Sequence, residues 1–257
     1  RAVHVVCPQV WAWKRGRIPK IEAALDKLCC FFPFEPALFK PGFAEFVGHP
    51  LADAFASEVK ARGEGEQRRE KTLAVLPGSR MGEIEKHMPV LLEAVERLQG
   101  EMPDLKVVIP AANERAYRAI SSFVSTIRQF GNSTIALSVV RGGARDVLCR
   151  ADAAVVASGT ATLEAALAGC PTVLVYKVGW LFAFLARRFI KDIRHVGLAN
   201  VIAEKADVPC PMPELLQENL TVENVFARIR PWLTDRAANA AARQSLADTM
   251  KLLKSDG

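Results

Sequence analysis

The feature that most constrains the fold is a regular alternation of short apolar runs with amphipathic segments after residue 72. The run Leu73-Ala74-Val75-Leu76 predicts a strand, and the segment after it carries apolar residues at three- and four-residue spacings, as one face of a helix does. Further strands are expected over 106–109, 134–140, 153–157 and 172–176, with helices over 116–128, 144–149 and 162–168. This alternation is typical of a parallel sheet with right-handed crossovers. It predicts an α/β fold with one complete Rossmann-like domain over 72–230.

The flanking segments indicate a second, incomplete domain. Residues 58–71 are nearly all charged or glycine and are expected to form a surface linker. Residues 1–57 hold an expected opening strand and an expected helix over 18–28, but they are too few for an independent domain. We interpret them as the remnant of an N-terminal Rossmann domain, and Arg1 as a truncation point. Residues 231–257 are expected to form a helical segment that packs back on the N-terminal domain or on a partner protomer.

Composition excludes several classes of protein. With 50% hydrophobic and 24% charged residues, the chain is globular rather than disordered, collagenous or coiled-coil. The longest uncharged apolar stretch, 178–186, is far shorter than the roughly 20 residues of a membrane helix. Six cysteines without a C-x-x-C pair predict no metal site and a reducing, cytoplasmic setting. The net charge of +6 favours anionic partners, but no nucleic-acid-binding motif accompanies it, so nucleic acid is discounted.

One expected strand-to-helix loop, 77–80, carries residues suited to a phosphate. In an open parallel sheet, ligands bind beyond the carboxyl ends of the strands. Gly78 permits close backbone approach, Ser79 offers a hydroxyl and Arg80 supplies a forked cation, with Glu83 following within the first helical turns. An ordinary turn with a solvated arginine explains the same residues equally well.

A second loop, 157–164, gathers small hydroxyl residues and a glycine at the start of a helix. The residues are Ser158, Gly159, Thr160 and Thr162. They leave free backbone N–H groups where the helix dipole favours negative charge, which suits a diphosphate. Glu164, about one turn into the helix, is placed to accept hydrogen bonds from ribose hydroxyls. Simple N-capping by a hydroxyl is the alternative. Neither a nicotinamide nor an ATP fingerprint is present, so no cofactor is expected.

A third feature is a stretch over 180–194 that mixes aromatic and basic side chains. Such a composition is typical of a helix that lies on an anionic membrane surface or grips an acyl chain near a phosphate. The expected contact residues are Trp180, Phe182, Phe184, Arg187, Arg188 and Lys191. A core helix with a basic outer face is the alternative.

Taken together, these segments resemble the lipid-A-disaccharide synthase family, inverting glycosyltransferases of the two-Rossmann-domain (GT-B) architecture. The resemblance covers nearly the whole chain and rests on an ordered set of segments. They are Pro8 to Trp13 with Arg15 to Arg17, Phe32 to Glu35, Val47 to Leu51, Leu76 to Arg80 with Glu83, Ala157 to Glu164, Ala186 to Arg188, Leu198 to Asn200 and Pro213 to Gln217. Two departures are Ala199, where the family usually has proline, and a small insertion over 207–212.

The resemblance implies transfer of 2,3-diacylglucosamine from its UDP donor to the 6-hydroxyl of 2,3-diacylglucosamine 1-phosphate (lipid X), with release of UDP. It implies that Arg80 and the helix start at 158–160 stabilise the leaving diphosphate and that Glu164 holds the ribose. Asn200, Glu214 and Gln217 would shape the donor pocket, and neither metal nor cofactor is expected. The implied partners are the UDP-diacylglucosamine donor, lipid X and an anionic membrane surface at the inner face of the inner membrane, with a possible homodimer.

The resemblance also implies that the general base lies outside this chain. We therefore expect the chain alone to bind UDP without catalysing transfer. Two other functions remain open. A UDP-sugar epimerase shares the architecture, although the segments 11–13 and 32–35 argue against it. A binding remnant for sugar nucleotides or acidic lipids would need no catalysis at all.

Overall fold

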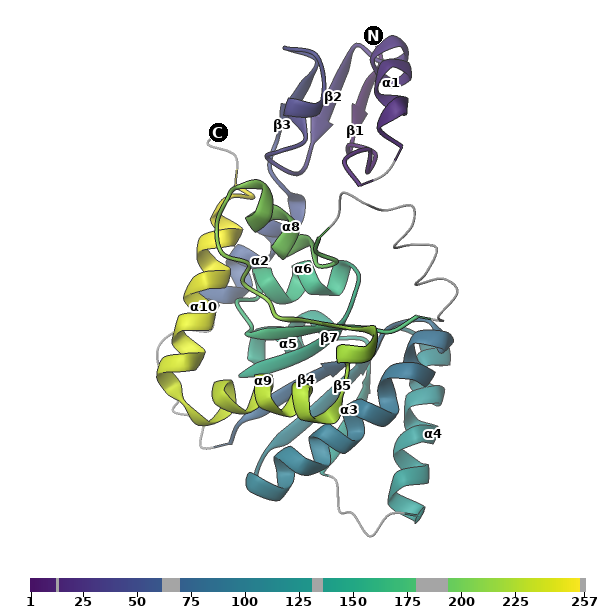
Figure 1. The fold of residues 1–257 in the computed structure, drawn as a ribbon, viewed down its shortest axis with the longest axis vertical. Helices are drawn as coiled ribbons and strands as arrows, with labels where there is room; N and C mark the ends of the chain where they lie inside the picture. The colour runs from purple at the N-terminus through teal and green to yellow at the C-terminus, as the bar shows by residue number, and fades with distance from the viewer. Residues whose placement is uncertain (13, 62–69, 131–135, 179–193, 255–257) are drawn as a thin grey trace.

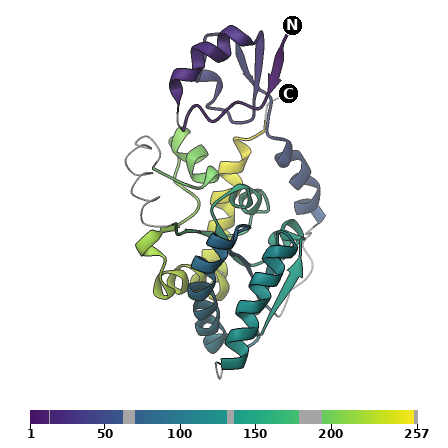
Figure 2. The same cartoon turned by 90° about the vertical axis from the view of Figure 1, so that its right-hand side faces the viewer.

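Two parallel sheets organise the chain, one of six strands and one of three (Figure 1). The structure, a computed structural model, describes residues 1–12, 14–61, 70–130, 136–178 and 194–254. The six-stranded sheet lies between layers of helices, and the three-stranded sheet lies at one end of the molecule in both views (Figures 1 and 2).

The six-stranded sheet grows in both directions from β4, and the direction changes after β6. The chain adds β5 and β6 toward one edge, then returns to place β7, β8 and β9 on the other side of β4, so the order is β6-β5-β4-β7-β8-β9. All neighbouring strands pair in parallel. The carboxyl ends of all six strands therefore meet at one edge of the sheet. The strands are β4 (Thr72–Leu76), β5 (Lys106–Ala111), β6 (Leu137–Arg141), β7 (Ala153–Ala157), β8 (Thr172–Tyr176) and β9 (Glu214–Leu216).

Alternate strand residues face two separate hydrophobic cores, because successive side chains of a strand point to opposite faces. Leu73 and Val75 of β4 lie in one core, and Ala74 and Leu76 lie in the other. The first core is covered by α3 (Met81–Glu101), α4 (Glu114–Phe130) and α9 (Val222–Thr234). The second is covered by α2 (Pro50–Ala61), α5 (Ala144–Arg150), α6 (Thr160–Leu167), α8 (Leu198–Lys205) and α10 (Arg236–Lys251).

The N-terminal residues form a small parallel sheet of order β1-β2-β3 with a core of its own. Its elements are β1 (Val3–Val5), η1 (Arg15–Arg17), α1 (Ile18–Ala24), β2 (Lys27–Cys30), η2 (Pro36–Leu38) and β3 (Ala44–Phe46). The helix expected over 18–28 is therefore wrong in its second half. The backbone becomes extended at Leu25, and Leu28 and Cys30 bury alternate side chains with 0% exposure. A strand of four residues is too short for its period of two to stand out against a helix.

Helix α2 leads from the small sheet to the large one. It continues to Ala61, inside the segment 58–71 that was expected to be a linker, and Phe55 is 2% exposed in the second core. The Arg145 guanidinium of α5 lies 4.3 Å from the centre of the Phe55 ring. The His49 N–H, just before α2, donates to the carbonyl of Leu253 near the other end of the chain, at 3.1 Å. The C-terminal segment thus meets the start of α2.

The expected fold class, α/β with parallel sheets, is confirmed, and the strands over 153–157 and 172–176 have the expected bounds. The expected C-terminal helical region consists of α9 and α10. The chain turns between them at Asp235, whose side chain accepts from the N–H groups of Ala237 at 2.8 Å and Ala238 at 3.3 Å. Among the helices that the structure describes, none has the length and hydropathy needed to cross a membrane.

Arg243 anchors α10 beneath the large sheet. Its guanidinium donates to the Gly169 carbonyl at 2.6 Å and to the Ala151 carbonyl at 3.0 Å, and its Nε donates to Oδ1 of Asn239 at 2.7 Å. Gly169 and Ala151 lie just before β8 and β7. One side chain therefore satisfies carbonyls at the amino ends of two central strands.

We expect Arg243→Met to lower the free energy of unfolding by about 2–4 kcal/mol, because the methionine keeps the apolar stem but removes the charged donor from both carbonyls. Arg236→Met is the matched control, since Arg236 is exposed at the start of the same helix. It should change the free energy of unfolding by less than about 0.5 kcal/mol. Urea denaturation measures both variants, and equal stabilities would contradict the anchoring role.

Candidate functional site

The loops that carry the predicted phosphate residues flank the point where the sheet reverses. β4 pairs directly with β7, with Leu76 opposite Val156, so the loops after these two strands leave from neighbouring carboxyl ends. β8 comes next, with Ala157 opposite Val175, and β9 follows it. In open parallel sheets, ligands bind in the crevice that diverging loops leave at such a reversal. The fold thus brings together the two loops that the sequence singled out.

The first loop is held in shape by Glu83. Its Oε2 accepts from the N–H groups of Ser79 at 3.3 Å and Arg80 at 3.4 Å, and its Oε1 lies 3.3 Å from Nη1 of Arg80. The Glu83 side chain is 14% exposed, whereas that of Arg80 is 83% exposed. Gly78 has a φ of +116°, and a Cβ there would lie 2.6 Å from Oε2 of Glu83. The carboxylate therefore fixes a glycine-dependent turn, and the guanidinium projects into solvent.

The second loop opens α6 without a side-chain cap. The N-cap residue is Gly159, which has no side chain, so neither Ser158 nor Thr160 is the N-cap that the capping alternative requires. The first N–H groups of a helix have no intrahelical acceptor. Ser158 is half-buried, and Gly159 and Thr160 are exposed. Thr162 is different: it is 0% exposed and its hydroxyl donates to the Gly159 carbonyl at 2.7 Å, so it supports the turn from inside.

Glu164 lies half-buried on the second turn of α6. Burial raises the pKa of its carboxyl, and the positive charge of Arg145 acts in the opposite direction. Arg145 belongs to α5 and donates to the Ala54 carbonyl of α2. The Glu164 carboxylate is therefore partly shielded from water on the side of α6 that faces α5.

Asn200 and Glu214 bind each other and the nearby backbone. Oε1 of Glu214 accepts from the Gly197 N–H at 3.0 Å and from Nδ2 of Asn200 at 2.9 Å. Asn200 is 1% exposed, and its amide also exchanges two hydrogen bonds with Met212, at 2.7 and 3.0 Å. The pair fixes the start of α8 to β9. Its influence on a pocket therefore passes through the backbone that it holds.

Gln217 lies directly after β9, beside the loop that follows β8. It has a φ of +53°, and its Oε1 accepts from the Val178 N–H at 3.4 Å. The residues expected to contact lipid fall within 179–193, outside the part of the chain that the structure describes. They are Trp180, Phe182, Phe184, Arg187, Arg188 and Lys191.

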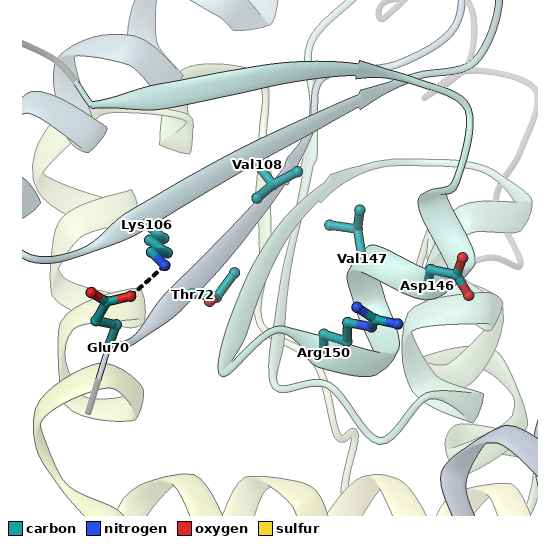
Figure 3. Close-up of a pocket in the computed structure, with 7 residues that line it drawn as sticks. All are labelled: Glu70, Thr72, Lys106, Val108, Asp146, Val147 and Arg150. Carbon is teal, nitrogen blue, oxygen red and sulfur yellow. Dashed lines mark ion pairs between the residues drawn. The ribbon is translucent and has the colours of Figure 1, made fainter. Parts of the chain in front are cut away.

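A cavity of about 640 Å³ lies away from these loops (Figure 3). Thr72 and Lys106 line it, and these residues begin β4 and β5. Helix α5 contributes Asp146, Val147 and Arg150. The cavity therefore opens at the amino ends of the strands, whereas ligands of parallel sheets bind beyond the carboxyl ends.

The comparisons with known proteins agree with one another. A family model described as Lipid-A-disaccharide synthetase matches residues 1–255. The chain belongs to this family. It is 36% identical to the lipid-A-disaccharide synthase of Anaeromyxobacter sp. (strain K) over 260 residues, which cover 99% of this chain and 65% of the relative. It is 39% identical to that of Burkholderia mallei (strain SAVP1) over 252 residues, which cover 96% of this chain and 61% of the relative. The chain thus spans less than two thirds of the length of these synthases.

A more distant likeness extends beyond the lipid-A-disaccharide synthetase family. The fold resembles a putative UDP-N-acetylglucosamine 2-epimerase from Listeria monocytogenes, with a TM-score of 0.56 and 14% sequence identity. The likeness covers 87% of this chain and 55% of that protein. At this identity, it shows a shared fold alone.

A buried histidine, which sequence reasoning missed, lies at the same edge of the six-stranded sheet. His87 of α3 is 0% exposed, and its Nδ1 lies 2.7 Å from the Pro77 carbonyl oxygen. Its Nε2 lies 3.0 Å from the Lys177 backbone nitrogen, which donates to it. The signal was a polar residue inside the apolar stripe that contains Ile84, Met88 and Leu91, because a polar group buried in such a stripe needs specific partners.

Tyr176, the last residue of β8, is a second residue that sequence reasoning missed. Burial raises the pKa of its hydroxyl, and the negative charge of Glu83 raises it further, whereas the positive charge of Arg80 lowers it. Tyr176 therefore lies within electrostatic reach of the glycine loop. Only the sheet order, in which β7 alone separates β8 from β4, brings Tyr176 near this loop.

The core of the small sheet holds a cluster of metal-ligating residue types, Cys7, Cys30 and Glu35. Their candidate ligand atoms lie within 4.8 Å of one another, and all three residues are buried. A hydrogen bond with Cys30, together with burial, raises the pKa of the Cys7 thiol, and burial raises the pKa of the Glu35 carboxyl. Raised pKa values favour the protonated forms of the thiol and the carboxyl. Glu35 also accepts from the Phe32 N–H at 3.1 Å, so its side chain braces the turn over 32–35.

We expect Gly78→Ala to lower the free energy of unfolding by about 1–3 kcal/mol, because the new Cβ would strain a positive-φ residue against Glu83. Gly82→Ala is the matched control, since Gly82 lies in the first turn of α3 with open space around its Cα. Alanine there should raise the stability by about 0.5–1 kcal/mol. Urea denaturation measures both variants, and a shift of the same sign in the two would contradict the role of the turn.

Proposed function

We propose that this chain carries the sugar-nucleotide side of a lipid-A-disaccharide synthase. The reaction would transfer 2,3-diacylglucosamine from UDP-2,3-diacylglucosamine to lipid X, giving lipid A disaccharide 1-phosphate and UDP. The observation that supports the proposal is the pairing of β4 with β7, because the loop that carries Arg80 and the loop that opens α6 then leave from neighbouring carboxyl ends in a member of this family. The name of the Listeria protein refers to UDP-N-acetylglucosamine, a sugar nucleotide of the donor class proposed here.

The proposed chemistry is a single in-line displacement at the anomeric carbon of the donor. The acceptor oxygen forms a bond to that carbon while the bond to the diphosphate oxygen breaks, so negative charge develops on the leaving UDP. Arg80 can meet this charge because its guanidinium is 83% exposed and its ion pair with Glu83, at 3.3 Å, lies at the surface. Exposed ion pairs contribute little stability, so the guanidinium can turn toward a diphosphate at small cost. The helix dipole of α6 adds positive potential from the other side of the crevice.

The other predicted residues serve the donor in this proposal. Glu164 would accept from the ribose hydroxyls, and its partial burial would strengthen such hydrogen bonds. Gly78, Ser79 and the residues 158–160 would approach the diphosphate through their backbone N–H groups. The remaining residues, which hold the surrounding loops, are Glu83, Thr162, Asn200, Glu214 and Gln217.

The acceptor side and the general base belong, in this proposal, to sequence beyond these residues. Two observations support this. The chain spans 65% of the Anaeromyxobacter relative. In addition, Val3, Val5 and Val6 expose 60%, 54% and 48% of their surface, whereas parallel sheets are usually covered on both faces. In this proposal, the stretch over 180–194 would contact lipid at the inner face of the inner membrane. The proposed homodimer is a separate point, which light scattering would test.

We expect Arg80→Ala in the full-length enzyme to lower kcat by about 10²–10³, because it removes a preorganised charge from the leaving group. The control is Arg236→Ala, an exposed arginine at the start of α10, where Asn239 donates to the Asp152 carbonyl at the amino end of β7. Release of UDP from the diacylated donor in the presence of lipid X measures both variants. A near-normal rate for Arg80→Ala would contradict the proposed site.

We expect the 257-residue chain alone to bind UDP but not to transfer the sugar. Isothermal titration with UDP, alongside the transfer assay, separates the two properties. Turnover by this chain would refute the assignment of the general base to another segment. A lack of UDP binding would refute the sugar-nucleotide site itself.

A further inference from the structure

We propose that His87 is a positioning residue that locks together the loops after β4 and β8, and so sets the geometry in which the crevice receives a nucleoside diphosphate. The proposal rests on the proposed function for the identity of the ligand. Its structural basis is a fully buried imidazole with one backbone partner on each ring nitrogen, at 2.7 Å and 3.0 Å.

The two contacts fix the state of the ring. The Lys177 N–H can only donate, so Nε2 of His87 must accept and carries no proton. The Pro77 carbonyl can only accept, so Nδ1 must carry the hydrogen. The structure therefore requires the neutral Nδ1–H tautomer. Loss of the ring would leave a carbonyl and an N–H without their partner in a buried position.

The two backbone partners of His87, Pro77 and Lys177, lie on different loops. β4 and β8 are not neighbours, because β7 lies between them. His87, which projects from α3, therefore bridges two loops that no strand pairing joins. The next residue along, Val178, donates to Oε1 of Gln217 after β9 at 3.4 Å. A row of hydrogen bonds thus links the loops after β4, β8 and β9 around the start of α6, where the diphosphate is proposed to bind.

The surroundings of the ring favour its neutral form, chiefly because the ring is buried. Burial lowers the pKa of His87 from its ordinary value of 6.5, and Lys86 and Lys177 lower it further. The Pro77 carbonyl and the charge of Glu83 act in the opposite direction. A proton added at Nε2 would face the Lys177 N–H, donor against donor. The folded pKa of His87 lies below the unfolded one. The contribution of the neutral ring to the free energy of unfolding is therefore complete above pH 6.5 and is lost as the pH falls through the folded pKa.

Three substitutions separate the two hydrogen bonds. His87→Leu removes both hydrogen bonds and fills the site with an apolar side chain of similar size. His87→Asn can keep the donor to Pro77, and His87→Gln can keep the acceptor for Lys177, because each amide reaches the place of one ring nitrogen. Titration of the chain with UDP at pH 7.5 should show about tenfold weaker binding for the leucine variant and intermediate losses for the other two. Met88→Leu, the adjacent buried residue, is the control and should bind UDP as the wild type does.

The pH dependence of UDP binding is a measurement that a purely structural role of His87 would not change. UDP binding by the wild type should weaken as the pH falls through the folded pKa of His87, which lies below 6.5, and more steeply than binding by His87→Leu, which has no ring to protonate. Protonation of UDP itself is common to both proteins and cancels in the comparison. Thermal unfolding of each variant establishes that it is folded at the temperature of the titration.

The outcomes separate this inference from the function on which it rests. If wild-type chain does not bind UDP, the sugar-nucleotide site fails, and the inference fails with it. If wild-type chain binds UDP and a folded His87→Leu variant binds equally well, with the same pH profile, only the role of His87 is overturned. Weaker binding by the leucine variant, partial retention by asparagine and glutamine, and a flatter pH profile together support it.

Discussion

The reversal of strand order at β4 is the constraint on which the rest of the site depends. If the chain had continued to add strands on one side, neighbouring loops would have turned to the same side of the sheet and left no crevice between them. Instead, β7 pairs with the free side of β4, and the two loops diverge from adjacent carboxyl ends. The loop that carries Arg80 and the start of α6 consequently follow neighbouring strands, although they lie some 80 residues apart in the sequence.

Carboxylates around this crevice satisfy backbone N–H groups and thereby set the loops. Glu83 accepts from Ser79 and Arg80, and Glu214 accepts from Val196 and Gly197. Each holds a loop with a charge that is itself mostly shielded, the two side chains being 14% and 9% exposed. Hydrogen bonds to charged groups are stronger than neutral ones, so such loops resist distortion when a ligand binds. Arg80, by contrast, is 83% exposed, and it is the residue proposed to meet the diphosphate.

The sequence predicted the large sheet well because its strands are continuous apolar runs and its helices carry clear apolar stripes. It failed over 18–28, where a short helix is followed at once by a four-residue strand. The loops at 77–80 and 157–164 were found from their residue types, which are unusual for plain turns. Thr162 was predicted at the diphosphate loop and Asn200 in the donor pocket, and the structure buries both side chains and bonds them to the protein's own backbone. His87 was missed because its partners, Pro77 and Lys177, are joined by tertiary structure alone.

The sequence by itself determined the α/β class and the strands and helices of the large sheet, and it singled out the two loops that are predicted to bind phosphate. It did so because periodicity and turn residues are local properties of the chain. Only the tertiary structure decided which side chains point into the crevice and which brace it. That decision depends on strand order and burial: the pairing of β4 with β7 brings the two loops together, and the interior determines whether a polar group finds its partner in the backbone or remains exposed for a ligand.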